Sequence, residues 1–78
     1  MNKTELHWLS FASEETGKNL GVVIVHANDI ISAVIKAHRL GINPGGQVAD
    51  FCIDGPISAE YLNRLLTPEE ARVLAEKA

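Results

Sequence analysis

The chain has one cysteine among its 78 residues, so no disulfide can form within it. Cys52 also lacks a second cysteine, or a histidine, at the spacing typical of structural zinc sites. These absences exclude a disulfide-stapled fold and predict a protein of a reducing compartment. A folded chain of this length buries only about 60% of the surface that its unfolded form exposes, so a lone monomer is expected to be marginally stable.

Long apolar runs are also missing. The longest uncharged one, residues 20–27, has about eight residues, whereas a membrane-spanning helix needs about 20. Polar residues follow Met1 in place of a signal-peptide pattern, so we expect a cytoplasmic protein. Lys and Arg number 7 against 10 Asp and Glu, a net charge of −3, which argues against binding to polymeric nucleic acid or to a membrane surface.

The N-terminal third of the sequence predicts two β-strands. Residues 6–12 have the pattern of a short strand, with Leu6, Trp8 and Ser10 on one side and His7, Leu9 and Phe11 on the other. Residues 20–27 are β-branched at four consecutive positions. The second strand is apolar on both faces, so we expect it to be central. The short polar segment 13–19 predicts that the two strands form an antiparallel hairpin.

A helix is predicted over residues 30–40. Asn28 or Asp29 supplies its N-cap, and Gly41 and Pro44 end it. Residues 47–53 alternate again and predict a third strand, in which Cys52 is expected to be a small buried side chain. Strand, helix and strand together predict a parallel, right-handed crossover.

The tail, residues 56–78, is predicted to be helical. Ser58 would cap a helix over 59–66, and Thr67, Pro68 and Glu70 form a capping box for a last helix over 68–76. A hinge is expected at 54–56. The sequence therefore predicts one α+β domain, 1–78, with a three-stranded ββαβ sheet, a crossover helix and a helical tail. One sheet face lacks a cover in this arrangement, so we expect a homodimer.

The loop at 43–47 is the strongest candidate for a ligand site. Pro44 and Gly45 suit a type II turn, and Gly46 removes another side chain, so backbone amides here can hold phosphate or carboxylate oxygens. Arg39 lies one helical turn earlier and can reach such an anion. The alternative is a tight connection with no ligand. Neither nucleotide-binding glycine fingerprint is present.

Histidines and the single tryptophan supply further candidates. His26 ends the central strand, His38 lies on the helix, and Trp8 can stack on a flat ligand, although all three can equally serve in the core or at an interface. No nucleophile lies beside a base, and no two ligand-type residues share a metal-binding spacing on one helix. We therefore expect no catalysis, no cofactor and no metal ion.

Two stretches carry a resemblance: Gly-Val-Val-Ile-Val-His-Ala at 21–27 and Ala-His-Arg-Leu-Gly-Ile-Asn-Pro-Gly-Gly-Gln-Val at 37–48. With His-Trp-Leu-Ser-Phe at 7–11 and Asn-Arg-Leu-Leu-Thr at 63–67, the chain resembles a family of small, functionally unassigned proteins of bacterial and phage genomes. The resemblance implies no activity. The phage association favours action by binding, in the host cytoplasm, on a host nucleotide signal or a host protein.

The sequence thus predicts a non-catalytic, homodimeric protein that sequesters a small anionic ligand, a nucleotide or nucleotide-derived signal. The predicted site consists of Trp8, His26, His38, Arg39, Asn43, Gly45, Gly46 and Gln47. One alternative is a protein-interaction module or inhibitor that docks through tail helices around Tyr61 and Leu65. The other is a small enzyme that uses His26 or His38 as a base.

Overall fold

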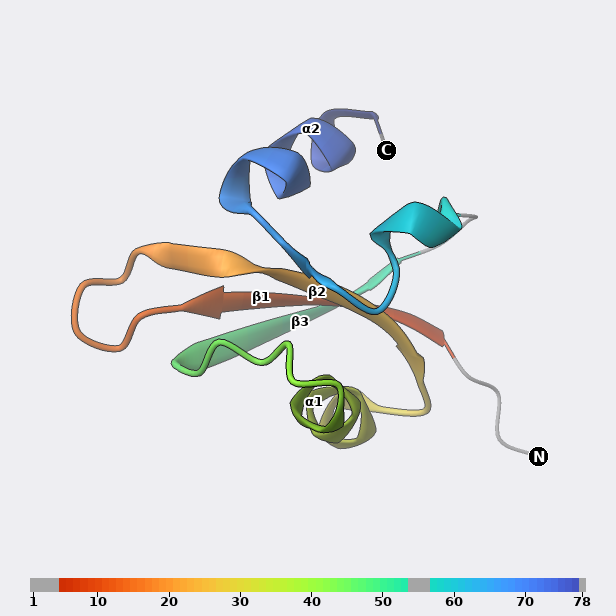
Figure 1. The fold of residues 1–78 in the computed structure, drawn as a ribbon, viewed down its shortest axis with the longest axis horizontal. Helices are drawn as coiled ribbons and strands as arrows, with labels where there is room; N and C mark the ends of the chain where they lie inside the picture. The colour runs from red at the N-terminus through yellow and green to blue at the C-terminus, as the bar shows by residue number, and fades with distance from the viewer. Residues whose placement is uncertain (1–4, 54–56, 78) are drawn as a thin grey trace.

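The computed structural model describes residues 5–53 and 57–77 as an α+β fold built on a four-stranded antiparallel sheet. Its elements in chain order are β1 (Glu5–Ala12), β2 (Asn19–Ala27), α1 (Ile30–Arg39), β3 (Gln47–Ile53), the 3₁₀ helix η1 (Ala59–Tyr61), β4 (Leu65–Leu66) and α2 (Pro68–Lys77). The strand order is β3-β1-β2-β4, so β1 and β2 form the centre and β3 and β4 the edges (Figure 1).

The predicted hairpin is confirmed. β1 and β2 pair antiparallel from Glu5 opposite Ala27 to Phe11 opposite Gly21. β3 pairs antiparallel with the other edge of β1, with His7 opposite Cys52. Because β1 runs against both neighbours, β2 and β3 run in the same direction, as predicted, but with β1 inserted between them. The unit is therefore a split βαβ crossover.

The predicted helix is present as α1. Asp29 is its N-cap, and its Oδ1 atom accepts a hydrogen bond from the Ser32 amide at 2.7 Å. The helix ends at Arg39, and Gly41 follows with a φ of 72° in the left-handed region, where glycine avoids a steric penalty. Local capping chemistry fixes both ends of this helix.

The prediction of a three-stranded sheet is wrong, because the tail contributes a fourth strand. Leu65 and Leu66 pair with Val23 and Val22 along the outer edge of β2. This pairing satisfies backbone groups that a bare edge would expose and buries Leu66 completely. The tail is therefore not all helical.

The first predicted tail helix is absent for the same reason. Over 59–66 only η1 is helical, and the Ser58 side chain makes no capping hydrogen bond. Asn63 then adopts a φ of 59°, which turns the chain toward β2, and its amide donates to the Ile24 carbonyl at 3.0 Å. The predicted hinge at 54–56 lies outside the described residues.

The last predicted helix is confirmed as α2, together with its capping box. The Glu70 amide donates to Thr67 Oγ1 and the Thr67 amide donates to Glu70 Oε1, both at 3.1 Å. This reciprocal pair satisfies two amides at the start of the helix.

Both faces of the sheet carry a buried cluster. The cluster on one face lies beneath α1, and that on the other lies beneath α2 and the rest of the tail (Figure 1). The first consists of Leu9, Phe11, Val23, Val25, Ala27, Ala33 and Ala37, and the second of Val22, Ile24, Leu66 and Ala71. An uncovered sheet face therefore no longer argues for a homodimer, and self-association needs another surface.

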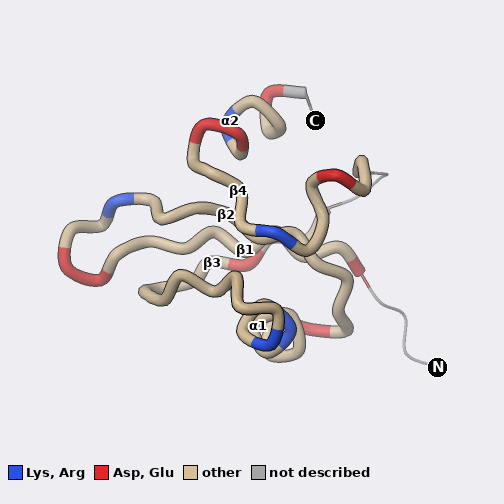
Figure 2. The backbone as a smooth tube through the Cα atoms, viewed as in Figure 1, with Lys and Arg blue, Asp and Glu red and all other residues tan. Residues whose placement is uncertain are grey.

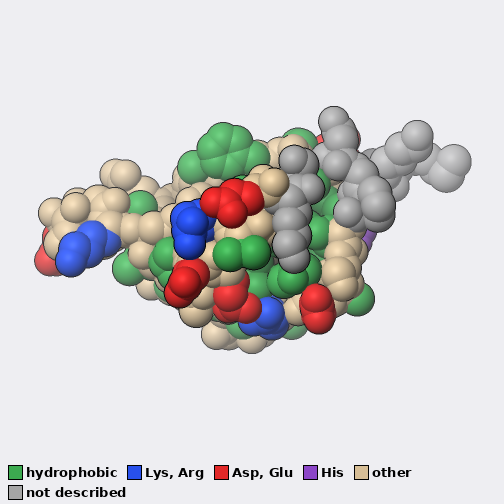
Figure 3. Space-filling model, turned by 90° about the horizontal axis from the view of Figure 1, so that it is seen from above, with side chains coloured by type: hydrophobic (Ala, Val, Ile, Leu, Met, Phe, Trp, Pro, Cys, Tyr) green, Lys and Arg blue, Asp and Glu red, His purple; other side chains and the backbone are tan. Residues whose placement is uncertain are grey.

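Neither helix of the described chain combines the length and the apolar character needed to cross a membrane. Among the described residues, Lys and Arg are divided between the loop after β1, α1, the segment before β4, and α2 (Figure 2). On the side that carries α2, acidic and basic side chains alternate among apolar ones (Figure 3). The described residues of this face therefore form no basic patch of the kind that binds a phosphate backbone.

Candidate functional site

Two glycines of the predicted ligand loop have left-handed backbone conformations, and one backbone amide of the loop is bonded within it. Gly45 and Gly46 have φ values of 86° and 79° and are both exposed. The Gly45 amide donates to Asn43 Oδ1 at 2.7 Å, so one amide offered to an anion is already engaged. A Cβ atom on Gly46 would collide with the Ala12 carbonyl oxygen, so this glycine also has a structural role.

The other predicted site residues do not all lie near this loop. Trp8 is half-buried and packs on the cluster beneath α2, and His26 is exposed on the same sheet face. His38 and Arg39 are exposed on α1, which covers the opposite face. Gln47 pairs with Ala12, and His26 pairs with Leu6, six residues and roughly 20 Å away along β1. The eight residues therefore form separate groups.

A different set of polar side chains does converge, on the α1 side of β1 and β3. His7 is only 3% exposed, and its Nδ1 atom lies 2.8 Å from Asp50 Oδ1. Its second ring nitrogen, Nε2, is buried and has no hydrogen-bond partner among the described residues. A buried polar atom left in this way carries a desolvation cost, so it calls for an explanation.

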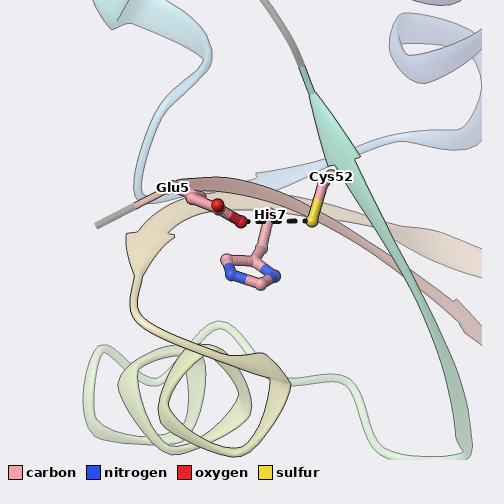
Figure 4. Close-up of side chains that lie close together, drawn as sticks. All are labelled: Glu5, His7 and Cys52. Carbon is pink, nitrogen blue, oxygen red and sulfur yellow. Dashed lines mark hydrogen bonds between the residues drawn. The ribbon is translucent and has the colours of Figure 1, made fainter. Parts of the chain in front are cut away.

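Glu5 and Cys52 flank this imidazole. One ligand atom from each of Glu5, His7 and Cys52 lies within 4.8 Å of the other two. The Cys52 thiol donates to Glu5 Oε2 at 3.5 Å, and the imidazole lies beside this contact, on the side facing α1 (Figure 4). We call these three residues the cross-strand cluster. Carboxylate, imidazole and thiolate are the three protein ligand types of zinc.

The prediction that Cys52 is buried is wrong. Cys52 lies on the edge strand β3, whereas α1 packs mainly on β1 and β2. Its thiol is therefore exposed, as is the Glu5 carboxylate, and only the histidine of the cluster is enclosed. The cluster is accordingly open to solvent on one side.

The sequence alone does not indicate this cluster, because its three residues have no metal-ligand spacing along one helix. Glu5 and His7 are two residues apart, a spacing that places both side chains on one face of a strand. Cys52 joins them only through the register of β3, which puts it directly opposite His7. The alternation of β1 could have indicated the first pair, but not the third residue.

A further carboxylate, that of Asp29, lies at the N-cap of α1. The pKa of Asp29 is lowered from its ordinary value, mainly because the Ser32 amide donates to this carboxylate, with a smaller contribution from the charge of His7. Asp29 therefore stays ionised on the same side of the sheet as the cross-strand cluster.

No family model, curated protein or solved structure matches the chain. The resemblance to small bacterial and phage proteins thus stays a prediction, and the function has to be argued from the side chains themselves.

Proposed function

We propose that this protein binds one divalent transition-metal ion of the zinc class, without turnover, through Glu5, His7 and Cys52. The observation that carries the proposal is the cross-strand cluster itself, in which one ligand atom each of a carboxylate, an imidazole and a thiol lie within 4.8 Å of one another. The Nε2 atom of this imidazole is also buried and has no hydrogen-bond partner among the described residues. An ion at this position would give Nε2 the partner that it lacks among the described residues.

The Asp50 contact favours this role for His7. An ionised carboxylate only accepts hydrogen bonds, so the proton shared with Asp50 belongs to His7 Nδ1. When Nε2 carries no proton it presents a lone pair, the form that coordinates a metal ion. A carboxylate behind a metal-bound histidine fixes the ring and its tautomer in many metal sites. Asp50 is accordingly a positioning residue.

The spacing of the cluster suits a tetrahedral ion. Zinc bonds of about 2.0 Å to nitrogen or oxygen and about 2.3 Å to sulfur place neighbouring ligand atoms roughly 3.3–3.8 Å apart. The distance from Cys52 Sγ to Glu5 Oε2 is 3.5 Å, within that range. The three ligand atoms are up to 4.8 Å apart, so the distance between the imidazole and the other two ligands has to shorten by about 1 Å. Glu5 and Cys52 are exposed and can move toward it.

The ligand types define the class of ion. Thiolate and imidazole favour zinc and its neighbours over magnesium and calcium, which prefer oxygen ligands. Binding releases the Cys52 thiol proton to solvent, so affinity should fall at acidic pH. Three protein ligands leave a fourth position for water or a small anion. A bound cation thereby gives an acidic protein a route to the anionic ligand predicted from its sequence.

Metal titration of the purified full chain tests the proposal. After chelator treatment, Co²⁺ should bind one to one, with strong visible absorption from tetrahedral thiolate coordination, and Zn²⁺ should displace it. We expect a Kd for Zn²⁺ tighter than about 10 μM and no competition from Mg²⁺. Absence of saturable binding, or equal competition by Mg²⁺, contradicts the proposal.

Variants separate this site from adventitious binding. Cys52→Ser and Glu5→Gln change exposed residues and should each weaken Zn²⁺ binding at least about tenfold. His38→Ala, which removes an exposed histidine of α1, should leave it unchanged. If Cys52→Ser binds Zn²⁺ as tightly as the unmodified chain, the cluster is not the site.

We propose as a second candidate the function predicted from the sequence, binding of a small nucleotide-like anion at the loop 43–47. The observation that favours it is that α1 ends with the exposed His38 and Arg39, and that the exposed Gly45 and Gly46 follow after residues 40–44. Because the Gly45 amide is engaged by Asn43, these side chains and the Gly46 amide would supply most of the attraction.

Calorimetry with cyclic nucleotides and ADP-ribose derivatives tests this candidate. A member of the panel should bind with a Kd tighter than about 100 μM. Arg39→Gln should weaken it, whereas Arg72→Gln on α2 should not. Mass spectrometry of small molecules released by heating the purified protein searches for a ligand outside the panel. Failure of both measurements rejects the candidate.

A further inference from the structure

β3 is the long strand of the sheet that the two helices cover least. It lies at an edge and, among the described residues, pairs with β1 alone (Figure 1). α1 packs mainly on β1 and β2, and α2 mainly on β2 and β4. None of the seven residues of β3 is buried, and four are exposed, including Phe51 at 58%. Its apolar packing comes from the half-buried Val48 and Ile53. β3 therefore depends largely on its pairing with β1, and such exposed edge elements open at a lower free energy than the centre of a fold.

Two polar side-chain contacts join β3 to β1, and both lie at or beside the cross-strand cluster. Asp50 Oδ1 lies 2.8 Å from His7 Nδ1, and the Cys52 thiol donates to Glu5 Oε2 at 3.5 Å. Glu5 and His7 belong to β1, whereas Cys52 belongs to β3 (Figure 4). A metal ion held by all three residues would therefore link the edge strand to the central one.

We propose that the metal ion is a switch that fastens β3 to the sheet, an inference that rests on the metal-binding function proposed above. Without the ion, β3 detaches reversibly from β1, and with the ion it stays docked. Detachment takes Cys52 away and leaves Glu5 and His7, so the detached form holds the ion less tightly. An ion that prefers the docked form shifts the equilibrium toward it.

The switch changes which strand edge the protein presents. With β3 docked, the outer edge of β3 faces solvent, and with β3 detached, the backbone donors and acceptors of β1 that paired with it do. Detachment also parts His7 from Asp50 and exposes an imidazole that is 3% exposed in the docked form. The concentration of the metal ion thereby controls a backbone edge and a buried side chain together.

Amide hydrogen exchange of the full chain, measured by NMR, tests the proposal. With a chelator, the β3 amides should exchange at least about tenfold faster than those of β2. With Zn²⁺ at about 100 times its Kd, exchange in β3 should slow by up to about 100-fold, the limit set by the ratio of bound to free docked protein. Mg²⁺ should not slow it. α2 holds none of the three ligands, so amides that exchange by its local opening should change less than about twofold.

Variants and metal binding measured in parallel separate the outcomes. Cys52→Ser should remove most of the slowing by Zn²⁺, because the ion no longer links the two strands. His38→Ala keeps all three ligands and should retain it. Equal exchange in β2 and β3 without metal overturns the proposal, because β3 then opens only with the whole sheet. Unchanged exchange in β3 while Co²⁺ absorption shows a bound ion also overturns it but leaves metal binding intact. Absence of any bound ion rejects the proposed function and the switch together.

Discussion

His7 Nδ1 lies 2.8 Å from Asp50 Oδ1, although the residue directly opposite His7 on β3 is Cys52 and not Asp50. The contact is diagonal, reaching two residues along the neighbouring strand on the same face. It fixes the orientation of a buried imidazole and leaves the Cys52 thiol to contact Glu5. One edge strand thus supplies both the residue that positions the ring and a candidate ligand beside it.

Asp50 should therefore matter for stability as well as for metal binding. Asp50→Ala leaves both ring nitrogens of the buried His7 without a described partner and should lower the free energy of unfolding by about 1–3 kcal/mol. Urea denaturation measures the loss. Gln47→Ala, an exposed position on the same strand, serves as the control and should change it by less than about 0.5 kcal/mol. Equal effects of the two substitutions would show that the His7–Asp50 contact contributes no stability.

The two loop glycines should respond differently to alanine. Both have positive φ values, so each substitution incurs a left-handed backbone penalty of about 1–2 kcal/mol. An added Cβ on Gly45 meets nothing within 4 Å, whereas on Gly46 it meets the Ala12 carbonyl oxygen. Gly46→Ala should therefore cost about a further 1–3 kcal/mol in thermal or urea unfolding. If the two variants are equally stable, the close packing of the loop against β1 is not present in solution.

Glu70 should make the stability of the tail depend on pH. Its pKa is lowered from its ordinary value of 4.5, first because Arg64 donates to its side chain at 2.9 Å, and then because the Thr67 amide also donates to it. A lowered folded-state pKa means that the stabilisation is fully present above the ordinary value and is lost as pH falls through the lowered pKa.

The comparison of Glu70→Gln with the unmodified chain measures this effect. The substituted protein should be less stable at pH 7, and the difference in Tm should shrink as the pH is lowered below about 4.5. Glu69→Gln is a matched control, because Glu69 is adjacent on α2 but its side chain makes no hydrogen bond among the described residues. A Tm difference for Glu70→Gln that is constant from pH 7 to pH 3 would count against the Arg64–Glu70 pair.

Local chemistry explains which elements the sequence predicts well. The start of α1 depends on Asp29 and Ser32, and that of α2 on Thr67 and Glu70, residues three apart whose hydrogen bonds form within one turn. Such signals need no knowledge of the rest of the fold. The hairpin of β1 and β2 is similarly local, because a short polar loop joins two consecutive segments with strand patterns.

Nonlocal pairing explains what the sequence did not predict. Leu62, Leu65 and Leu66 have helical spacing, and only the open edge of β2 favours an extended conformation at Leu65 and Leu66. The cross-strand cluster likewise depends on the register of β3 against β1. The spread of the predicted ligand residues over two sheet faces has the same origin, since it follows from strand order and not from neighbours in the chain.

Two alanine substitutions distinguish the observed strand from the predicted helix. In the structure Leu66 is completely buried, whereas Leu65 is 36% exposed at the edge of the sheet. Leu66→Ala should therefore cost about 2–5 kcal/mol of unfolding free energy, the range for large-to-small changes in a core. Leu65→Ala should cost clearly less, about 1 kcal/mol. In a helix over 59–66 both residues would lie on one apolar stripe and respond alike. Urea denaturation of the two variants measures the difference, and equal losses would contradict the pairing of β4 with β2.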